Sequence, residues 1–565
     1  MAYSLLITCS FFWVRDLRKH GLGDWLSLVK RQEKIPWRYC RYVQGFLILY
    51  LVGNLALVWI SALGPAIEFD DILYHLTGPK SFVAAHALTK VVDIPHVFLP
   101  KNMEMLFTLG MLLHNEVTAK LIHCLLGFLV MLLLYAVSTR LWGYPVGLVA
   151  FAILVSSPLF LWEMRTAHVD VGLALYVFIA LYSVIHWLQS RDRSWFVLAV
   201  ISTAFSLGVK YHGLFGLVSL AIVIVVHDLT MGKRCYSAVS SGVRFAFISA
   251  LGLLPWGMVN FFQTKDPVFP LLNGLFHSPY WTSELTQMVI RQQKEGGVVI
   301  GLGNWWEVFT IFWTMIADQT NRFHGRIGPF FFLLIPLLIL RVRKRIGLEV
   351  KLILGFSLIY SMIWIFTAQH SRFLLSLLPG LAMVAAYASV KWVKGVSTQL
   401  SQLFGAAVQS VLILMAVLST PFFGRYGTHP HYGSSLLPSL PLKYLLGKET
   451  KCEHLSVHVP SYPAIRYLNS LPEQKKVLFW WNTLPAAFYV EGKSAWLFSP
   501  FTPPLLGDDP ERIREILIQN GVTHLIAGHK EQEVNVITNP GGPFVQRYLR
   551  TLFSGNGTVL YEVLP

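Results

Sequence analysis

Four short segments carry acidic, basic and imidazole side chains between stretches that are otherwise strongly apolar. The segments hold Glu68, Asp70 and Asp71; Arg165, His168 and Asp170; Lys210, Tyr211 and His212; and Arg372. A carboxylate can accept a proton from a hydroxyl nucleophile. Lysine and arginine bind phosphate through charge-assisted hydrogen bonds. Together these side chains would suit a reaction that deprotonates a hydroxyl group beside an anionic ligand.

Each segment also has a simpler interpretation. Glu68, Asp70 and Asp71 could form an ordinary solvated loop, and a single basic residue near a membrane surface could extend its charged end toward water. Ionisable side chains at membrane depth are costly, however, and therefore point to function. The functional interpretation becomes the stronger one if all four segments lie on the same face of a membrane.

The composition indicates a membrane protein. Of the 565 residues, 54% are hydrophobic and only 13% are charged, whereas soluble domains average about 25% charged residues. This composition also excludes disorder, which needs low hydrophobicity and high charge. The net charge of +16 first indicates basic cytoplasmic loops, so no nucleic-acid partner is expected. The five cysteines show neither metal-ligand spacing nor a disulfide framework.

Apolar stretches of sufficient length predict a polytopic α-helical protein with about eleven transmembrane helices. The expected spans are 45–63, 119–139, 146–162, 171–188, 195–209, 214–226, 245–262, 327–340, 352–367, 373–388 and 404–422, with 305–316 as a shorter re-entrant candidate. Alternate loops are rich in lysine and arginine, which places those loops in the cytoplasm. This topology puts all four chemical segments on the outer face, with two long outer loops at 66–103 and 263–326.

The topology divides the chain into three regions. Residues 1–44 are expected to form a basic amphipathic segment on the cytoplasmic face, held partly by anionic membrane lipids. Its first apolar stretch is interpreted as interfacial rather than as a cleaved signal. Residues 45–422 would form the transmembrane domain, and residues 423–565 an extracytoplasmic α/β domain. In this last domain strands are expected at 475–481, 486–490, 522–527 and 559–564, and a helix at 510–520.

The order of the motifs resembles the GT-C superfamily of integral-membrane glycosyltransferases. The similar branch uses polyprenyl-phosphate sugars and includes protein O-mannosyltransferases and aminoarabinose transferases. The resemblance covers about residues 45–390 and begins with Asp70-Asp71, followed by Tyr74, His75 and Pro79-Lys80. Its other parts are Pro100-Lys101-Asn102-Met103-Glu104, Asp170, Gly208-Val209-Lys210-Tyr211, Asp266-Pro267-Val268-Phe269-Pro270 and Gln369-His370-Ser371-Arg372-Phe373.

The resemblance implies a GT-C fold and a reaction in one displacement step that inverts the anomeric centre. The donor would be a sugar on a polyprenyl phosphate, and the acceptor hydroxyl would belong to a glycan, a lipid or a protein. Asp70 would be the general base and Asp170 a second catalytic carboxylate, while Asp71 remains a rival for the role of base. The implied donor-phosphate residues are Lys210, Arg372, Lys101 and Tyr211, and the implied substrate-binding residues are Tyr74, His75, His168 and Glu104.

The implied reaction needs neither a nucleotide nor a metal, although the acidic pair could hold a divalent ion. The resemblance also implies a bacterial plasma membrane, with the active site and the C-terminal domain outside. Two other functions remain open. A transporter or flippase of lipid-linked saccharides would explain many spans and buried charges, but such proteins often show internal repeats, and none stands out here. A non-catalytic assembly protein with the GT-C fold is the second alternative.

Overall fold

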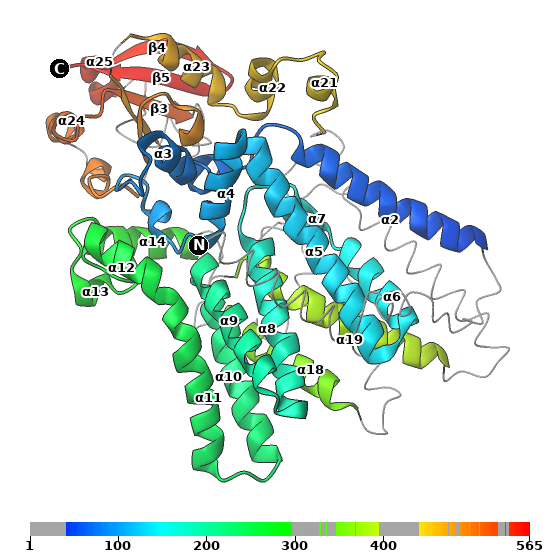
Figure 1. Ribbon diagram of the computed structural model, residues 1–565. Helices are drawn as coiled ribbons and strands as arrows, with labels where there is room; N and C mark the ends of the chain where they lie inside the picture. Colours follow the sequence, from blue (N-terminus) through cyan, green and yellow to red (C-terminus); the bar gives the residue numbers. More distant parts are fainter. Residues whose placement is uncertain are drawn as a thin grey trace.

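The computed structural model describes most of the chain. The described residues are 41–295, 311, 327–328, 331, 335, 346–367, 369–394 and 440–565, the last range with gaps at 473, 481–485, 497, 508, 529–536, 538 and 540–541. Residues 1–40 of the expected segment 1–44, the span 404–422 and most of 305–316 and 327–340 lie outside these residues. Within them the protein is mostly helical, with one small sheet near the C-terminus (Figure 1).

The helical part consists of apolar helices that run side by side. They are α2 (Arg41–Ala62), α5 (Glu116–Trp142), α6 (Tyr144–Val155), α7 (Pro158–Met164), α8 (Asp170–Ser190), α9 (Arg193–Val209), α10 (Gly213–Thr230), α11 (Cys235–Ala250), α12 (Leu254–Thr264), α18 (Leu348–Ile365) and α19 (Leu378–Lys394). Among the described residues, six helical segments are long and apolar enough to cross a membrane, or seven if the bent pair α6–α7 is one span. The expected number of about eleven spans stays a prediction.

The expected span at 146–162 is divided into two helices. Helices α6 and α7 meet at an angle of 73°. Pro158 is the first residue of α7 and has no backbone N–H to continue the hydrogen bonding of α6, so the helix breaks there. Because of this break α7 is short and leads directly into residues 165–169, which carry two of the side chains that the sequence points to, Arg165 and His168.

The segment between α2 and α5 forms a separate helical layer. It contains a π-helical turn, η1 (Asp71–His75), followed by α3 (Thr77–Ala85), η2 (Pro95–Phe98) and α4 (Asn102–Leu113). Asp70 is the N-cap residue of η1, and all five residues of η1 are buried. Single π-helical turns are rare and often occur at functional sites.

The C-terminal part contains a five-stranded mixed sheet with the strand order β2-β1-β3-β5-β4. Strand β1 (Lys476–Phe479) is parallel to β2 (Lys493–Trp496) and to β3 (His524–Gly528). Strand β5 (Thr558–Val563) is antiparallel to β3 and to β4 (Leu549–Gly555). Helix α24 (Pro510–Gln519) begins as expected, with the Asp509 carboxylate accepting the backbone N–H groups of Glu511 and Arg512.

The strand expected at 486–490 is wrong, because this segment contains the 3₁₀ turn η5 (Ala487–Tyr489). The Tyr489 hydroxyl donates a hydrogen bond to the Ala66 carbonyl, at 2.7 Å. The Lys80 ammonium of α3 donates to the carbonyls of Phe488 and Val490, at 2.6 and 2.9 Å. These contacts with the layer that follows α2 hold Ala487–Tyr489 in a turn rather than in a strand. The sheet therefore lies over α3 and α4 (Figure 1).

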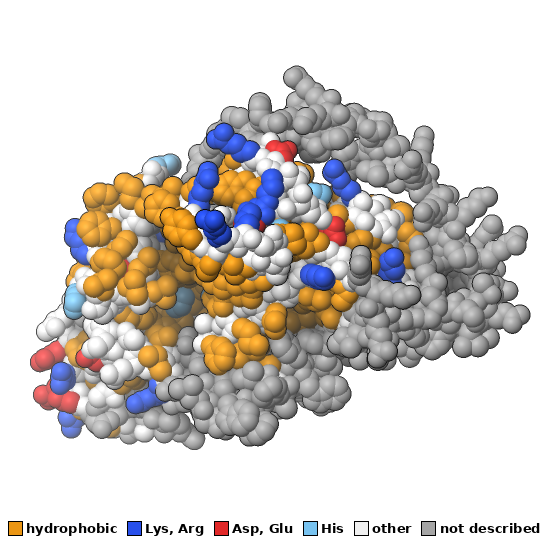
Figure 2. Space-filling view, turned by 90° about the horizontal axis from the view of Figure 1, so that it is seen from below, with side chains coloured by type: hydrophobic (Ala, Val, Ile, Leu, Met, Phe, Trp, Pro, Cys, Tyr) orange, Lys and Arg blue, Asp and Glu red, His pale blue; other side chains and the backbone are white. Residues whose placement is uncertain are grey.

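The opposite end of the helical bundle is basic. Figure 2 shows this end from below, with lysine and arginine side chains gathered across it. Arg191 and Arg193 are exposed in the turn between α8 and α9, and Lys233 and Arg234 in the turn between α10 and α11. The charges that the sequence assigns to the cytoplasm thus lie at the end away from the sheet.

Candidate active site

Residues from the four chemical segments are brought together at the end of the bundle that faces the sheet. Four ion pairs connect side chains that are far apart in sequence: Arg165 with Glu68, His168 with Asp71, Lys210 with Asp170, and Arg372 with Asp70. All eight residues are buried or nearly so. The sequence-based expectation that these segments share one face is therefore supported by direct contacts.

Asp70 is held by Arg372, which belongs to the 3₁₀ segment η4 (Ser371–Leu377). The Arg372 Nη1 atom donates to Asp70 Oδ2. Burial by itself would raise the pKa of the Asp70 carboxyl, but the charges of Arg372, His168 and His75 hold it well below its usual range. Asp70 is therefore ionised, and it is a weak proton acceptor while Arg372 stays in place.

The second pair joins Asp170, the first residue of α8, to Lys210, which ends α9. The Lys210 Nζ atom lies 3.2 Å from Asp170 Oδ1 and 3.4 Å from Oδ2. The turn after Lys210 is tight, because a side chain at Gly213 would come within 2.6 Å of the Ser206 carbonyl oxygen. Glycine at this position therefore allows α9 and α10 to meet closely and places Lys210 between them.

Both cations lie against the same aromatic ring. The Lys210 Nζ atom is 4.6 Å from the centre of the Phe373 ring, and the Arg372 guanidinium carbon is 5.5 Å from it. Cations are attracted to the face of an aromatic ring. Burial lowers the pKa of Lys210, the Asp170 carboxylate opposes this effect, and the nearby charge of Arg372 adds to it. Two positive charges are thus concentrated at one place and balanced by two carboxylates.

Asp71 differs from its neighbour Asp70 in accessibility. The Asp71 side chain has no exposed surface, whereas 8% of the Asp70 side chain is exposed. Asp71 Oδ1 accepts the backbone N–H of Ala167 at 2.9 Å. Burial raises the pKa of the Asp71 carboxyl against the influence of His168. Asp70 therefore keeps a small exposed surface, whereas Asp71 is fully buried.

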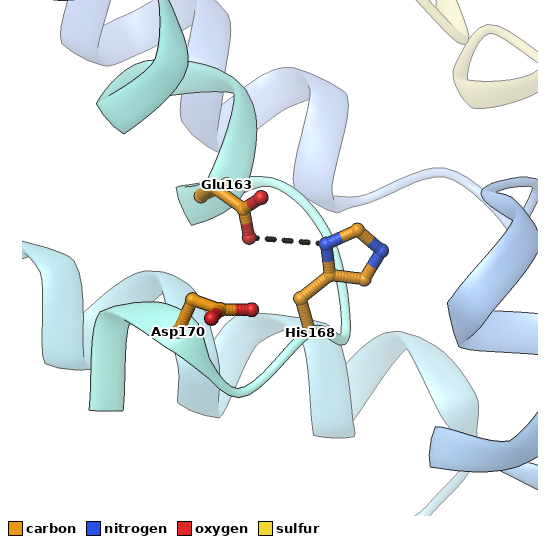
Figure 3. A group of neighbouring side chains, drawn as sticks. All are labelled: Glu163, His168 and Asp170. Carbon is orange, nitrogen blue, oxygen red and sulfur yellow. Dashed lines mark hydrogen bonds and ion pairs between the residues drawn. The ribbon is translucent and has the colours of Figure 1, made fainter. Parts of the chain in front are cut away.

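Glu163 is a site residue that the sequence analysis missed. It lies in α7, has no exposed surface, and its Oε2 atom is 3.0 Å from Nδ1 of His168 (Figure 3). The signal that could have identified it is a lone acidic residue directly after the expected span 146–162, since acidic residues at membrane depth point to function.

Glu163, His168 and Asp170 form the group that could hold a metal ion, because one ligand atom of each lies within 4.8 Å of the others (Figure 3). The donor set is chemically suitable for a divalent ion. The neighbouring Lys210 disfavours such an ion, because its ammonium lies 3.2 Å from Asp170 and would repel a second cation. A metal-free reaction stays a prediction.

The remaining expected substrate residues line another side of the site. The His75 Nδ1 atom lies 2.7 Å from Glu104 Oε1. The Tyr74 ring packs against His75 and His96, with ring centres 4.1 and 5.1 Å apart. His96 in turn contacts Trp496 of β2, with ring centres 5.3 Å apart. The C-terminal sheet thus contributes a side chain close to the site.

Lys101 and Tyr211 bond to other groups than the two paired cations do. The Lys101 ammonium donates to the Leu99 carbonyl at 3.1 Å and to Asn260 Oδ1 at 3.4 Å. Burial lowers the pKa of Lys101 to about 8, and Glu104 opposes the shift. The Tyr211 hydroxyl donates to the Phe269 carbonyl at 3.2 Å. The expected donor-phosphate residues therefore form two groups.

An apolar cavity of about 360 Å³ lies beside α12. Its walls include Tyr211, Pro100, Trp256 and the segment Pro267-Val268. The outer residues of α12, among them Phe262, are strongly exposed and apolar. The cavity is large enough to hold part of a hydrocarbon chain.

Known proteins resemble this chain in two ways. Residues 102–256 match the family model described as dolichyl-phosphate-mannose-protein mannosyltransferase. An uncharacterised protein of Shigella flexneri is 26% identical over 171 residues, which are 29% of this chain and 84% of that protein.

Solved structures share the fold across almost the whole chain. ArnT from Cupriavidus metallidurans, crystallised with undecaprenyl phosphate, has a TM-score of 0.55 and 14% identity, covering 92% of this chain and 98% of its own. The Archaeoglobus fulgidus oligosaccharyltransferase in its apo form has a TM-score of 0.52 and 11% identity, covering 93% and 75%. Its complex with an inhibitory peptide and a dolichol-phosphate scores 0.50 at 12% identity, covering 92% and 74%. The chain therefore has the GT-C fold, and the resemblance drawn from its motifs is confirmed.

Proposed function

We propose that this protein is a membrane glycosyltransferase that moves a sugar from a polyprenyl-phosphate carrier to an acceptor hydroxyl, with inversion. The observation that carries the proposal is the pair of cations, Lys210 and Arg372, that lie against the Phe373 ring beside two carboxylates. Fixed cations stabilise the charge that develops on a leaving phosphate. A carboxylate at the same place can take the proton from the attacking hydroxyl.

The ion pair between Asp70 and Arg372 connects donor binding to catalysis. A donor phosphate would compete with Asp70 for the Arg372 guanidinium. Once Arg372 donates to the phosphate, Asp70 loses its counter-ion and becomes a better proton acceptor. The acceptor oxygen then attacks the anomeric carbon, its proton passes to Asp70, and the bond from the anomeric carbon to the phosphate oxygen breaks. The carrier phosphate leaves with its charge stabilised by Lys210 and Arg372.

The accessibility of the two acidic residues favours Asp70 as the base. An acceptor hydroxyl must come within about 3 Å of the group that takes its proton. The Asp70 side chain is partly exposed, while Asp71 is fully buried and accepts the Ala167 N–H. We therefore assign the base to Asp70 and a structural role to Asp71.

The apolar cavity beside α12 supports a lipid-linked donor. Its hydrocarbon lining suits a prenyl chain, and Tyr211 in its wall is the residue directly after Lys210. Relatives with this fold were solved with undecaprenyl phosphate and with a dolichol-phosphate, which supports the same class of carrier here. The basic end of the bundle would lie in the cytoplasm, so that the site and the sheet face the outside.

The direct test is binding of undecaprenyl phosphate to the purified full-length protein, together with a comparison of glycans from cells with and without it. We expect saturable binding that Lys210→Ala weakens, and a glycan that is lost with the protein and not restored by Asp70→Asn. Unchanged glycans would contradict the proposal. Transport of an intact lipid-linked saccharide by the Asp70→Asn variant would favour the flippase instead.

A further inference from the structure

The proposed reaction leaves the buried Glu163 without a role. Its side chain in α7 has no exposed surface, and its Oε1 atom has no hydrogen-bond partner within the described part of the chain. Burying a carboxylate is costly unless charged or hydrogen-bonding partners compensate. Its other oxygen, Oε2, has such a partner in His168, at 3.0 Å from Nδ1.

His168 lies between two carboxylates. Its Nδ1 atom faces Glu163, and its Nε2 atom is 3.5 Å from Asp71 Oδ1. The ring has no exposed surface, so it cannot easily contact a substrate directly. The ring therefore contacts both carboxylates, through a hydrogen bond with Glu163 and an ion-pair contact with Asp71.

Asp71 connects His168 to the proposed base, Asp70. Its Oδ1 atom accepts the Ala167 N–H at 2.9 Å and lies 3.5 Å from His168 Nε2, an ion-pair contact rather than a hydrogen bond. Asp71 is the first residue of η1, and Asp70 is the N-cap residue of the same turn. Fixing Asp71 therefore fixes the backbone from which the Asp70 carboxylate extends.

We propose that Glu163 and His168 are positioning residues for the transfer reaction: Glu163 orients His168, His168 holds Asp71, and Asp71 fixes the direction of Asp70. This inference rests on the proposed function, with Asp70 as the base. A base that is displaced by even 1 Å from its productive position loses much of its effect. Neither Glu163 nor His168 then needs to touch donor or acceptor.

The test uses the full-length protein in detergent with the variants Glu163→Gln and Glu163→Asp. Glutamine keeps the size and a hydrogen-bond acceptor but removes the charge, while aspartate keeps the charge at a greater distance. Transfer is assayed with an extract of membranes from cells lacking the protein as the source of donor and acceptor. The product followed is the glycan that those cells lack. Binding of undecaprenyl phosphate is measured separately.

We expect Glu163→Gln to bind undecaprenyl phosphate with the wild-type Kd and to transfer at least about tenfold more slowly at saturating extract. Glu163→Asp should recover part of that rate. The matched control is Asp228→Asn, which neutralises another buried carboxylate. Asp228 lies at the basic end of the bundle, where it pairs with Arg191 and Lys233. We expect folded Asp228→Asn protein to transfer at the wild-type rate.

Two results would overturn the inference: a wild-type maximal rate in Glu163→Gln, or a rate loss that is fully explained by weaker binding of undecaprenyl phosphate. If Glu163→Gln does not fold, Glu163→Asp decides alone, because an unchanged maximal rate in that variant also rejects the positioning role. Asp70→Asn is assayed in parallel. Transfer retained by that variant would reject the proposed base itself, whatever Glu163 does.

Discussion

Arg372 donates a hydrogen bond to the carboxylate of Asp70, although the two residues are 302 positions apart in the sequence. The contact joins the N-cap of η1 to the start of η4, so it links the layer that follows α2 with the helix α19 that follows η4. It pairs the expected base with an expected phosphate ligand. The carboxylate thus occupies the guanidinium that a donor phosphate would need.

Removing the charge of Asp70 should abolish transfer. Asp70→Asn keeps the shape of the side chain but cannot accept the proton, so the rate should fall by about 10²- to 10⁴-fold. Undecaprenyl phosphate should bind at least as tightly to this variant, because Arg372 no longer has a competing carboxylate. The measurements are the transfer rate and the Kd of undecaprenyl phosphate. Weaker binding in Asp70→Asn would contradict the proposed competition.

The two groups of expected phosphate ligands should differ in their effects. Lys210→Ala removes a cation beside Phe373 and should weaken binding of undecaprenyl phosphate by about tenfold or more. Lys101→Met should change this binding by much less, since the Lys101 ammonium is already engaged by the Leu99 carbonyl and Asn260. Both dissociation constants can be measured with the same purified preparations. Equal losses would place Lys101 in the phosphate site after all.

Lys210→Ala also leaves the Asp170 carboxylate buried and unpaired, which costs about 3–5 kcal/mol. Its lower stability must therefore be separated from its effect on binding. The double variant Lys210→Met with Asp170→Asn removes both charges and should recover most of the thermal stability without recovering the binding. Thermal unfolding in detergent measures the first effect, and titration with undecaprenyl phosphate measures the second.

Chelation should leave the reaction intact. The ammonium of Lys210 is 3.2 Å from Asp170 and disfavours a divalent ion at Glu163, His168 and Asp170. We therefore expect transfer in membranes to continue in excess EDTA at close to the untreated rate. Loss of activity that magnesium, manganese or zinc restores would assign a metal to this group.

The orientation can be tested by placing one exposed cysteine in a protein whose five native cysteines, including the exposed Cys235, are replaced by serine. Val457 in α22 (Lys451–His458) is 73% exposed, so Val457→Cys should react with a membrane-impermeant maleimide added to intact cells. A cysteine in place of Arg193, in the basic turn between α8 and α9, should react only after the membrane is opened. The reverse pattern would invert the topology and move the site to the cytoplasm.

The sequence by itself was enough to predict the fold class of the protein. Its apolar composition and its basic alternate loops pointed to a membrane protein, and the order of its motifs pointed to the GT-C fold. The solved structures confirm the fold. These features are local: a span needs only a run of apolar residues, and a helix start such as Asp509 needs only a capping side chain. Predictions failed where a distant contact decided the local structure, as at Ala487–Tyr489, whose backbone follows the contact of Tyr489 with Ala66.

Only the tertiary structure decided which charged groups meet. It paired Asp70 with Arg372 and Asp170 with Lys210, buried Asp71, added Glu163 through His168, and gave Lys101 the partners Leu99 and Asn260. The physical reason is that each of these residues lies at the end of a helix or in the turn beyond it. The distances between helix ends depend on the packing of helices that are far apart in sequence, and so does the exposure of each carboxylate. Spacing along the chain carries no direct information on either.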